Sequence, residues 1–116
     1  MRPLQAAGKR TRRVAIQRPT ETRSSSGQAT ITYAVFERRW ARVDSLSGNE
    51  LVQAREVVPR ASHRVYIEPI AGLTTRCRLV LREGEVDERV LSIESITDAM
   101  EDGRGLEILC TEAPAV

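Results

Sequence analysis

The first third of the chain contains a short run of alternating apolar and polar positions, which is typical of a β-strand. In residues 13–18, Val14 and Ile16 fall on one face. The run is predicted to stop at Pro19, because proline cannot donate a hydrogen bond to a neighbouring strand. Residues 20–29 are polar and rich in serine and threonine, so we expect a mobile loop after this strand.

Residues 31–43 are predicted to form one long strand or two short ones, because apolar side chains recur along this stretch. Successive side chains of a strand point to opposite faces. Ala41 and Val43 therefore share one face, and Trp40 is expected to point the other way.

The pattern changes to helical spacing after residue 46. Ser47 and Glu50 have the spacing of a capping box, in which the serine hydroxyl accepts from the Glu50 backbone N–H and the glutamate side chain reaches back to the Ser47 N–H. Pro59 ends the segment, since proline is incompatible with a helix interior. A helix near residues 47–57 is predicted, with three apolar positions on one face: Leu51, Ala54 and Val58.

A period of two returns in the second half of the chain. Three runs of inward-facing residues predict three strands: His63, Val65 and Ile67; Cys77, Leu79 and Leu81; Leu106, Ile108 and Cys110. A further strand covers residues 89–93, and the opposite parity of Ile96 predicts a bulge near residues 94–95. Turns are expected at residues 83–85 and 98–105.

The predicted fold is mainly β, a small antiparallel β-barrel or sandwich of about six strands with one inserted α-helix. We expect a flexible basic arm at residues 1–11, a single domain at residues 12–112 and a short tail at residues 113–116.

Composition adds a strong charge asymmetry. Of the 18 basic side chains, 17 are arginine. Residues 1–60 hold 12 basic and 5 acidic side chains, whereas residues 61–116 hold 6 basic and 11 acidic ones. Such polarity fits either a basic arm that meets nucleic acid or two faces that meet in neighbouring copies, and it is also compatible with an unevenly charged solvated surface. With four aromatic residues, the core is expected to be aliphatic and thin, which favours extra burial against partner subunits.

Several classes of function are disfavoured. No apolar run approaches the ~20 residues that span a bilayer, and the N-terminus lacks the apolar region of a secretory signal, so no membrane association is expected. His63 is the sole histidine and shares its face with core residues, so we interpret it as structural. Cys77 and Cys110 are interpreted as small buried apolar residues. We therefore predict no catalytic, cofactor-binding or metal-binding residues, and no enzyme.

Two charged groups are candidates for binding. The basic segment from Lys9 to Arg13 can neutralise phosphates, although no aromatic residues lie among its arginines to stack on bases. Any nucleic-acid contact there would be to the backbone and independent of sequence. Four carboxylates crowd the predicted turn and most simply solvate it: Glu83, Glu85, Asp87 and Glu88.

Taken in order, several short stretches resemble the tailed-phage head–tail joining proteins, also known as head closure, stopper or head–tail adaptor proteins. They are Val14 to Thr20, Gly27-Gln28, Trp40-Ala41, Leu46-Ser47-Gly48 with Glu50, His63-Arg64-Val65 with Ile67, Arg89 to Ile96 with Asp98, and Leu106 to Cys110. The chain departs from the family at Glu68-Pro69, where an arginine and an aromatic residue are usual, and at Leu91, where an aromatic residue is common.

The resemblance implies a small β-barrel with an inserted helix and a mobile loop. It implies a homo-oligomeric ring, commonly a dodecamer, that closes the head after DNA packaging in the neck of a virion, having assembled in the host cytoplasm. The implied partners are a portal or adaptor protein on the head side, a tail terminator or tail tube protein on the other side, and DNA in the channel. The alternative from the residues alone is a small nucleic-acid-binding β-barrel.

A more specific hypothesis concerns the local charge of the N-terminal region. Copied around a ring, this charge would repel itself unless it met DNA or an acidic surface. We therefore expect five arginines to lie near the channel or a neighbour: Arg10, Arg12, Arg13, Arg18 and Arg23. The acidic counterpart is either the neighbour's residues 83–88 or the portal adaptor.

Overall fold

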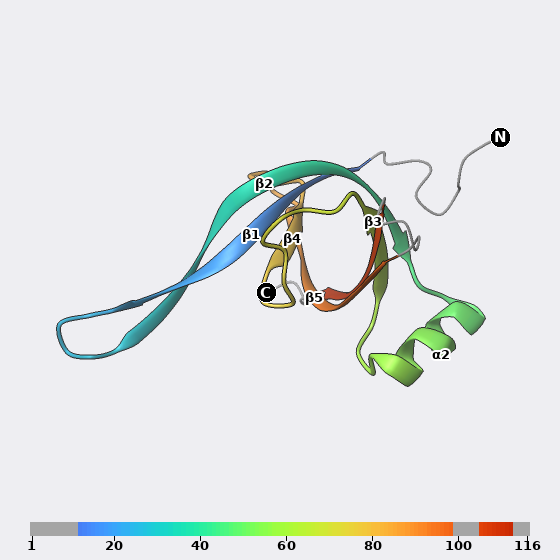
Figure 1. Ribbon diagram of the computed structural model, residues 1–116, viewed down its shortest axis with the longest axis horizontal. Helices are drawn as coiled ribbons and strands as arrows, with labels where there is room; N and C mark the ends of the chain where they lie inside the picture. Colours follow the sequence, from blue (N-terminus) through green and yellow to red (C-terminus); the bar gives the residue numbers. More distant parts are fainter. Residues whose placement is uncertain (1–11, 99–104, 113–116) are drawn as a thin grey trace.

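The computed structural model describes residues 12–98 and 105–112. Six β-strands and one α-helix follow one another along the chain (Figure 1). Their bounds are β1 Arg12–Arg23, β2 Ala29–Ser45, α2 Gly48–Val57, β3 His63–Ile67, β4 Arg78–Leu81, β5 Arg89–Asp98 and β6 Leu106–Glu112. The prediction of a mainly β fold with one inserted helix is confirmed.

The strands close into a barrel in the order β1-β2-β3-β6-β5-β4, and every neighbouring pair is antiparallel. Closure removes the unpaired edges that an open sheet would expose. β2 therefore lies opposite β5 in the barrel wall, because three steps separate them in either direction around the ring of strands.

β1 and β2 are much longer than the barrel needs. They pair from Arg12↔Ala41 to Arg23↔Ala29 with one register shift between Ile16 and Gln17, whereas β4 pairs with β1 only from Val14 to Gln17. β3 pairs with β2 only from Arg42 to Ser45. The remainder of the two strands leaves the barrel as a two-stranded hairpin, which extends to one side in Figure 1. It gives the molecule its elongated dimensions of 58 × 30 × 27 Å.

The sequence-based prediction was wrong about this hairpin. Pro19 does not stop β1 but pairs with Tyr33, and residues 20–23 and 29 belong to strands instead of a mobile loop. Proline is tolerated because, within the described residues, β1 has no second neighbour beyond Gln17, so no strand requires the N–H that Pro19 lacks. Polar strands of this kind resemble loops in sequence, since neither face is buried.

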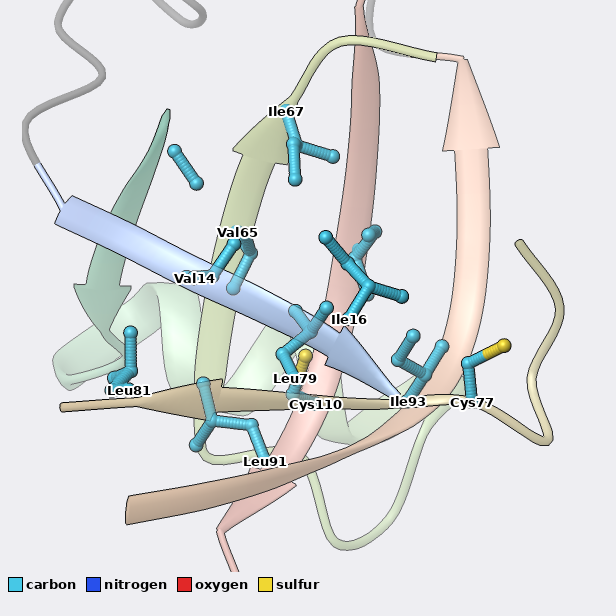
Figure 2. Packing of buried hydrophobic residues seen from close by; sticks show 12 residues of the cluster. Val14, Ile16, Val65, Ile67, Cys77, Leu79, Leu81, Leu91, Ile93 and Cys110 are labelled. Atoms are coloured by element: carbon cyan, nitrogen blue, oxygen red, sulfur yellow. The ribbon is translucent and has the colours of Figure 1, made fainter. Parts of the chain in front are cut away.

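The barrel interior is packed with aliphatic side chains and two cysteines (Figure 2). The inward residues of β1, β3, β4, β5 and β6 are those that alternation predicted, and Ala41 is buried while Trp40 is 53% exposed, as expected. Fully or almost fully buried members of this cluster are Val14, Ile16, Ala41, Val65, Ile67, Leu79, Leu81, Leu91, Ile108 and Cys110. The predicted bulge in β5 is confirmed by the register shift between Ile93 and Ser95.

A second, smaller apolar cluster lies under α2. Ala54 and Val58 of the helix segment pack with Leu46, Ala61 and Leu109, and Leu51 adds a partly buried contact. Leu109 has outward parity on β6, yet the helix covers it. The inserted helix therefore packs against the outside of the barrel and covers part of its outer surface.

The predicted capping box is wrong in its chemistry, although the helix begins where it was expected. Ser47 is the N-cap residue with extended backbone, but its side chain makes no capping hydrogen bond. Its carbonyl accepts the first helical bond from the Leu51 N–H at 3.2 Å. The Glu50 carboxylate instead lies 3.3 Å from Nη1 of Arg64, so a cross-element ion pair replaces the reciprocal cap.

The turn predicted at residues 83–85 is present, with the Glu85 N–H donating to the Arg82 carbonyl at 3.0 Å. The turn predicted at residues 98–105 lies mostly outside the described residues, as do the predicted arm at residues 1–11 and the tail at residues 113–116.

Candidate functional site

The arginines singled out in the sequence are spread along β1 and do not form one cluster. Arg12 and Arg13 begin the strand at the barrel, Arg18 lies at the root of the hairpin and Arg23 at its tip. Arg12 and Arg23 are separated by roughly 35 Å, given the rise of an extended strand. Arg10 lies outside the described residues.

Arg12 and Arg13 line a cleft of about 360 Å³ beside the β4–β5 turn. The other lining residues are Ala15, Arg38, Arg82, Glu83 and Glu85. The structure thus brings the start of β1 and the acidic turn together within one subunit, an arrangement that the sequence hypothesis had placed between neighbours. Whether a neighbour also contacts them stays a prediction.

Three carboxylates of the turn, those of Glu83, Asp87 and Glu88, have partners in their own chain. Nε and Nη2 of Arg38 donate to the two carboxylate oxygens of Glu83 at 2.9 and 3.0 Å. This fork-shaped pair lowers the pKa of Glu83, chiefly through the hydrogen bond from Arg38. Oδ2 of Asp87 lies 3.0 Å from Nη1 of Arg82, and the Glu88 carboxylate accepts a hydrogen bond from the Gly84 N–H at 2.9 Å.

The root of the hairpin is held on both faces by arginine–aromatic stacking. On one face, the Arg18 guanidinium lies 4.0 Å from the centroid of the Phe36 ring. On the other face, Arg78 of β4 lies 3.8 Å from the centroid of Tyr33 and donates to the Gln17 side chain at 2.6 Å. Adjacent positions in a strand face opposite ways, so the two stacks clamp the ribbon between them.

Gly72 completes the clamp on the Arg18 side. Its backbone has a φ of 87°, a conformation that glycine adopts without strain. A Cβ atom at this position would lie 2.8 Å from Nη2 of Arg18. Sequence reasoning missed Gly72, Phe36 and Arg78 as a group, since they come from three separate segments and no spacing relates them.

The tip of the hairpin is a tight polar turn. The Ser24 N–H donates to the Gln28 carbonyl at 3.0 Å, and the Gly27 N–H donates to the Ser24 carbonyl at 2.9 Å. Gly27 has a φ of 87°, as expected in a three-residue hairpin loop. Nη1 of Arg23 donates to the Gly27 carbonyl at 3.2 Å, and its Nη2 lies 3.5 Å from Oε2 of Glu21. The positive charge of Arg23 is therefore partly balanced.

Two more arginine–aromatic pairs lie on the barrel wall. Arg13 lies over Trp40 at 5.6 Å, and Arg42 over Tyr66 at 5.8 Å. Every aromatic ring of the chain therefore has an arginine guanidinium of the same chain over it, although Trp40 remains 53% exposed. This arrangement leaves less aromatic surface for stacking on nucleic-acid bases than the number of rings alone would indicate.

His63 links four strand ends at one end of the barrel. Its Nε2 lies 3.1 Å from Nη2 of Arg89 and 3.3 Å from the Ser45 hydroxyl, while its Nδ1 lies 2.8 Å from the Ser62 hydroxyl. Arginine can only donate, so Nε2 must accept and the proton of the neutral ring belongs on Nδ1. The Glu112 carboxylate receives two bonds from Arg89, at 2.8 and 3.1 Å.

Burial is the main reason that the pKa of His63 lies below its ordinary value, and Arg89 lowers it further, against an opposing effect of Glu112. His63 is buried and hydrogen-bonded, as its position on the strand predicted, and its purely structural role stays a prediction. Cys77 and Cys110 are free and buried, as predicted, and burial raises the pKa of Cys110 to about 12.

Two further features are absent from the part of the chain that the structure describes. Residues 12–98 and 105–112 contain no group of three or more histidine, cysteine or carboxylate side chains placed to hold a metal ion. No helix in these same ranges has the length and apolar character needed to cross a membrane.

Comparisons with solved structures find the same fold elsewhere. Protein SF1141 from Shigella flexneri 2a, known from a solution structure, is 25% identical with a TM-score of 0.75, over 94% of this chain and 97% of that one. A chain from the virion of a native gene transfer agent particle is 13% identical with a TM-score of 0.57, over 90% of this chain and 96% of that one. The latter likeness concerns the fold alone.

A search of curated proteins found no match. The family model of the phage head completion protein matches residues 6–113. Because that match spans nearly the whole chain, the protein belongs to the phage head completion protein family, and its role is a structural one in the phage head.

Proposed function

We propose that this protein is a head–tail connector that closes the filled head of a tailed phage or phage-like particle. In this proposal, copies form a ring, commonly of twelve, in the neck of the virion. A portal or adaptor protein lies on the head side, and a tail terminator or tail tube protein on the other. The protein acts by binding its neighbours and catalyses no reaction.

The observation that carries the proposal is a closed barrel with a long projecting hairpin in a chain of the head completion family. A compact barrel of this size has a thin aliphatic core, and the hairpin has none, so both gain stability from contacts with other subunits. The clamps at the hairpin root hold it at a fixed angle, which suits a projection that must reach the same place in every copy.

The charge distribution supports contacts between copies and with DNA. The first half of the chain is basic and the second half acidic, which favours head-to-tail contacts between neighbours. The alternative, a free-standing nucleic-acid-binding barrel, needs open aromatic rings. The arginine over each ring supports the connector instead.

Deleting the gene from the phage or prophage that carries it tests the proposal. We expect DNA-filled heads that lack tails and lose their DNA to nuclease, and rescue by the wild-type gene supplied in trans. Electron microscopy and nuclease protection measure both results. Intact, infectious particles without the protein would refute the proposal.

The proposed DNA contact has its own test. Changing Arg10, Arg12 and Arg13 together to Ser should reduce DNA retention in filled heads at physiological salt, because phosphate contacts depend on charge. Arg60→Ser is the control, since Arg60 is also exposed but belongs to the segment between α2 and β3. Unchanged DNA retention and assembly in the triple variant would contradict this contact.

A further inference from the structure

The two edges of the projecting hairpin are not equivalent. In an antiparallel pair, residues that face each other alternate between pairs that bond across the hairpin and pairs whose backbone groups point outward. The turn bond from the Ser24 N–H to the Gln28 carbonyl fixes the phase of this alternation. The outward-pointing residues are therefore Pro19, Glu21 and Arg23 on β1, and Ala29, Ile31 and Tyr33 on β2.

The β1 edge is blocked to pairing and the β2 edge is open. Pro19 has no N–H to offer, which is a common way for proteins to protect a strand edge. On the β2 edge, an N–H points outward at each of the three positions. Within residues 12–98 and 105–112, β2 pairs only with β1 and, from Arg42 onward, with β3, so no other backbone segment covers this edge.

Apolar side chains stand on the same outward-pointing residues of β2. Ile31 is 58% exposed and Tyr33 is 38% exposed, and both share one face of the hairpin. On this face they line a shallow cleft of about 290 Å³, which continues over Pro19 to residues 75–78 at the start of β4 and to Ser92 of β5. Unpaired backbone donors and acceptors beside exposed apolar side chains are the two requirements for adding a strand to a sheet.

We propose that the outer edge of β2, from Ala29 to Tyr33, binds an extended segment of a different protein as an added β-strand. This inference rests on the proposed function and names a contact that the connector would use. The added strand bonds to the outward backbone groups, and its apolar side chains cover Ile31 and Tyr33. The occupant is a different protein because a neighbour's β1 edge is blocked by Pro19, and because β2-to-β2 pairing would close two copies into a dimer instead of a ring.

A matched pair of proline variants tests the proposal in particles. Glu21 and Ile31 face each other across the hairpin, and both N–H groups point outward. Ile31→Pro removes a donor from the open edge, whereas Glu21→Pro removes one from the edge that Pro19 already blocks. Pro19 itself shows that a proline at such a position is compatible with the hairpin.

We expect Ile31→Pro to weaken the contact by about tenfold in binding constant, the effect of losing one good hydrogen bond, and so to lower the number of copies retained in purified particles. Glu21→Pro should remain near the wild-type number. Quantitative mass spectrometry of particles measures both. Equal losses in the two variants, or no loss in either, would overturn the proposal.

Hydrogen exchange gives a second readout that needs no variant. In the free protein, the amides of Ile31 and Tyr33 should exchange fast and those of Thr30 and Thr32 slowly. In particles, the segment at residues 29–33 should become at least tenfold more protected. Unchanged protection would overturn the proposal, and so would a free dimer that Ile31→Pro converts to a monomer, since a second copy would then be the occupant.

These outcomes are separable from failure of the proposed function. If the wild-type protein is absent from particles, the connector function itself is wrong. If the protein is present and the deletion prevents tail joining, but Ile31→Pro behaves like wild type, only the strand-addition contact is wrong.

Discussion

The barrel and the hairpin are built from the same two strands but are stabilised in different ways. Inside the barrel, β1 contributes Val14 and Ile16, which are fully buried among aliphatic residues. Beyond Gln17, the same strand has no core and is held by Arg18 and Arg78 stacked on aromatic rings. The comparison shows how one continuous strand pair can serve as a stable body and as an exposed projection.

The largest expected difference between the two regions is in the response to truncation. Leu79→Ala should lower the free energy of unfolding by about 2–5 kcal/mol, because Leu79 is fully buried. Ile31→Ala in the hairpin should change it by less than about 0.5 kcal/mol, since the side chain is mostly exposed. Urea unfolding followed by circular dichroism measures both, and comparable losses would contradict the distinction.

The clamp at the hairpin root should show an intermediate effect. Gly72→Ala places an alanine at a φ of 87° and brings its Cβ against the Arg18 side chain. We therefore expect the free energy of unfolding to fall by about 1–2 kcal/mol and hydrogen exchange near Arg18 to become faster. Gly27→Ala is the matched control, because it has the same φ but no atom within 4 Å of the added Cβ. If the two variants loosen the root equally, the clamp has no special role.

Acid should weaken the barrel end at His63 and leave the hairpin largely unaffected. Burial places the pKa of His63 below its ordinary value of 6.5 in the folded protein, so the unfolded chain takes up the proton more readily. The stabilisation is complete above pH 6.5 and is lost as the pH falls below that value. The lowered pKa of Glu112 adds a loss of the same sign at lower pH, near and below 4.5.

Urea unfolding between pH 7.5 and 5 measures this loss. His63→Gln keeps an acceptor for Arg89 but cannot titrate, and its stability should vary less with pH over this range. An identical pH dependence in the wild type and the variant would exclude His63 as the source.

The smallest expected effect concerns the helix cap. The sequence pattern predicts that Ser47→Ala lowers the free energy of unfolding by ~1 kcal/mol. The structure lowers this expectation to less than about 0.5 kcal/mol, because the Ser47 side chain makes no capping bond. Thermal unfolding of Ser47→Ala, compared with Glu50→Ala, measures this change in the free energy of unfolding. A full loss of ~1 kcal/mol for Ser47→Ala would show that the capping box forms after all.

The barrel was predictable from sequence because burial on one face leaves a period of two in the chain. Leu91 and Ile93, or Ile108 and Cys110, can be assigned inward by counting, and the parity of Ile96 even locates the bulge. The helix was predictable because burial of one of its faces leaves helical spacing instead, as between Ala54 and Val58.

The hairpin was not predictable in this way, since both of its faces are exposed at residues 20–32 and no alternation marks them. Pro19, interpreted as the end of the strand, instead lies on an edge of the hairpin where β1 pairs with β2 alone. The pairing of Arg38 with Glu83 likewise depends on the closure of the barrel, which brings together residues far apart in the chain. Long-range arrangement of this kind leaves no local signal.

An electron cryomicroscopy map of the assembled particle tests the central claim most directly. The connector account predicts a ring of this protein at the head–tail junction, with its channel on the particle axis and its hairpins in contact with another protein of the neck. A map that places the protein elsewhere in the particle, or that leaves no copy of it at the junction, would contradict the account.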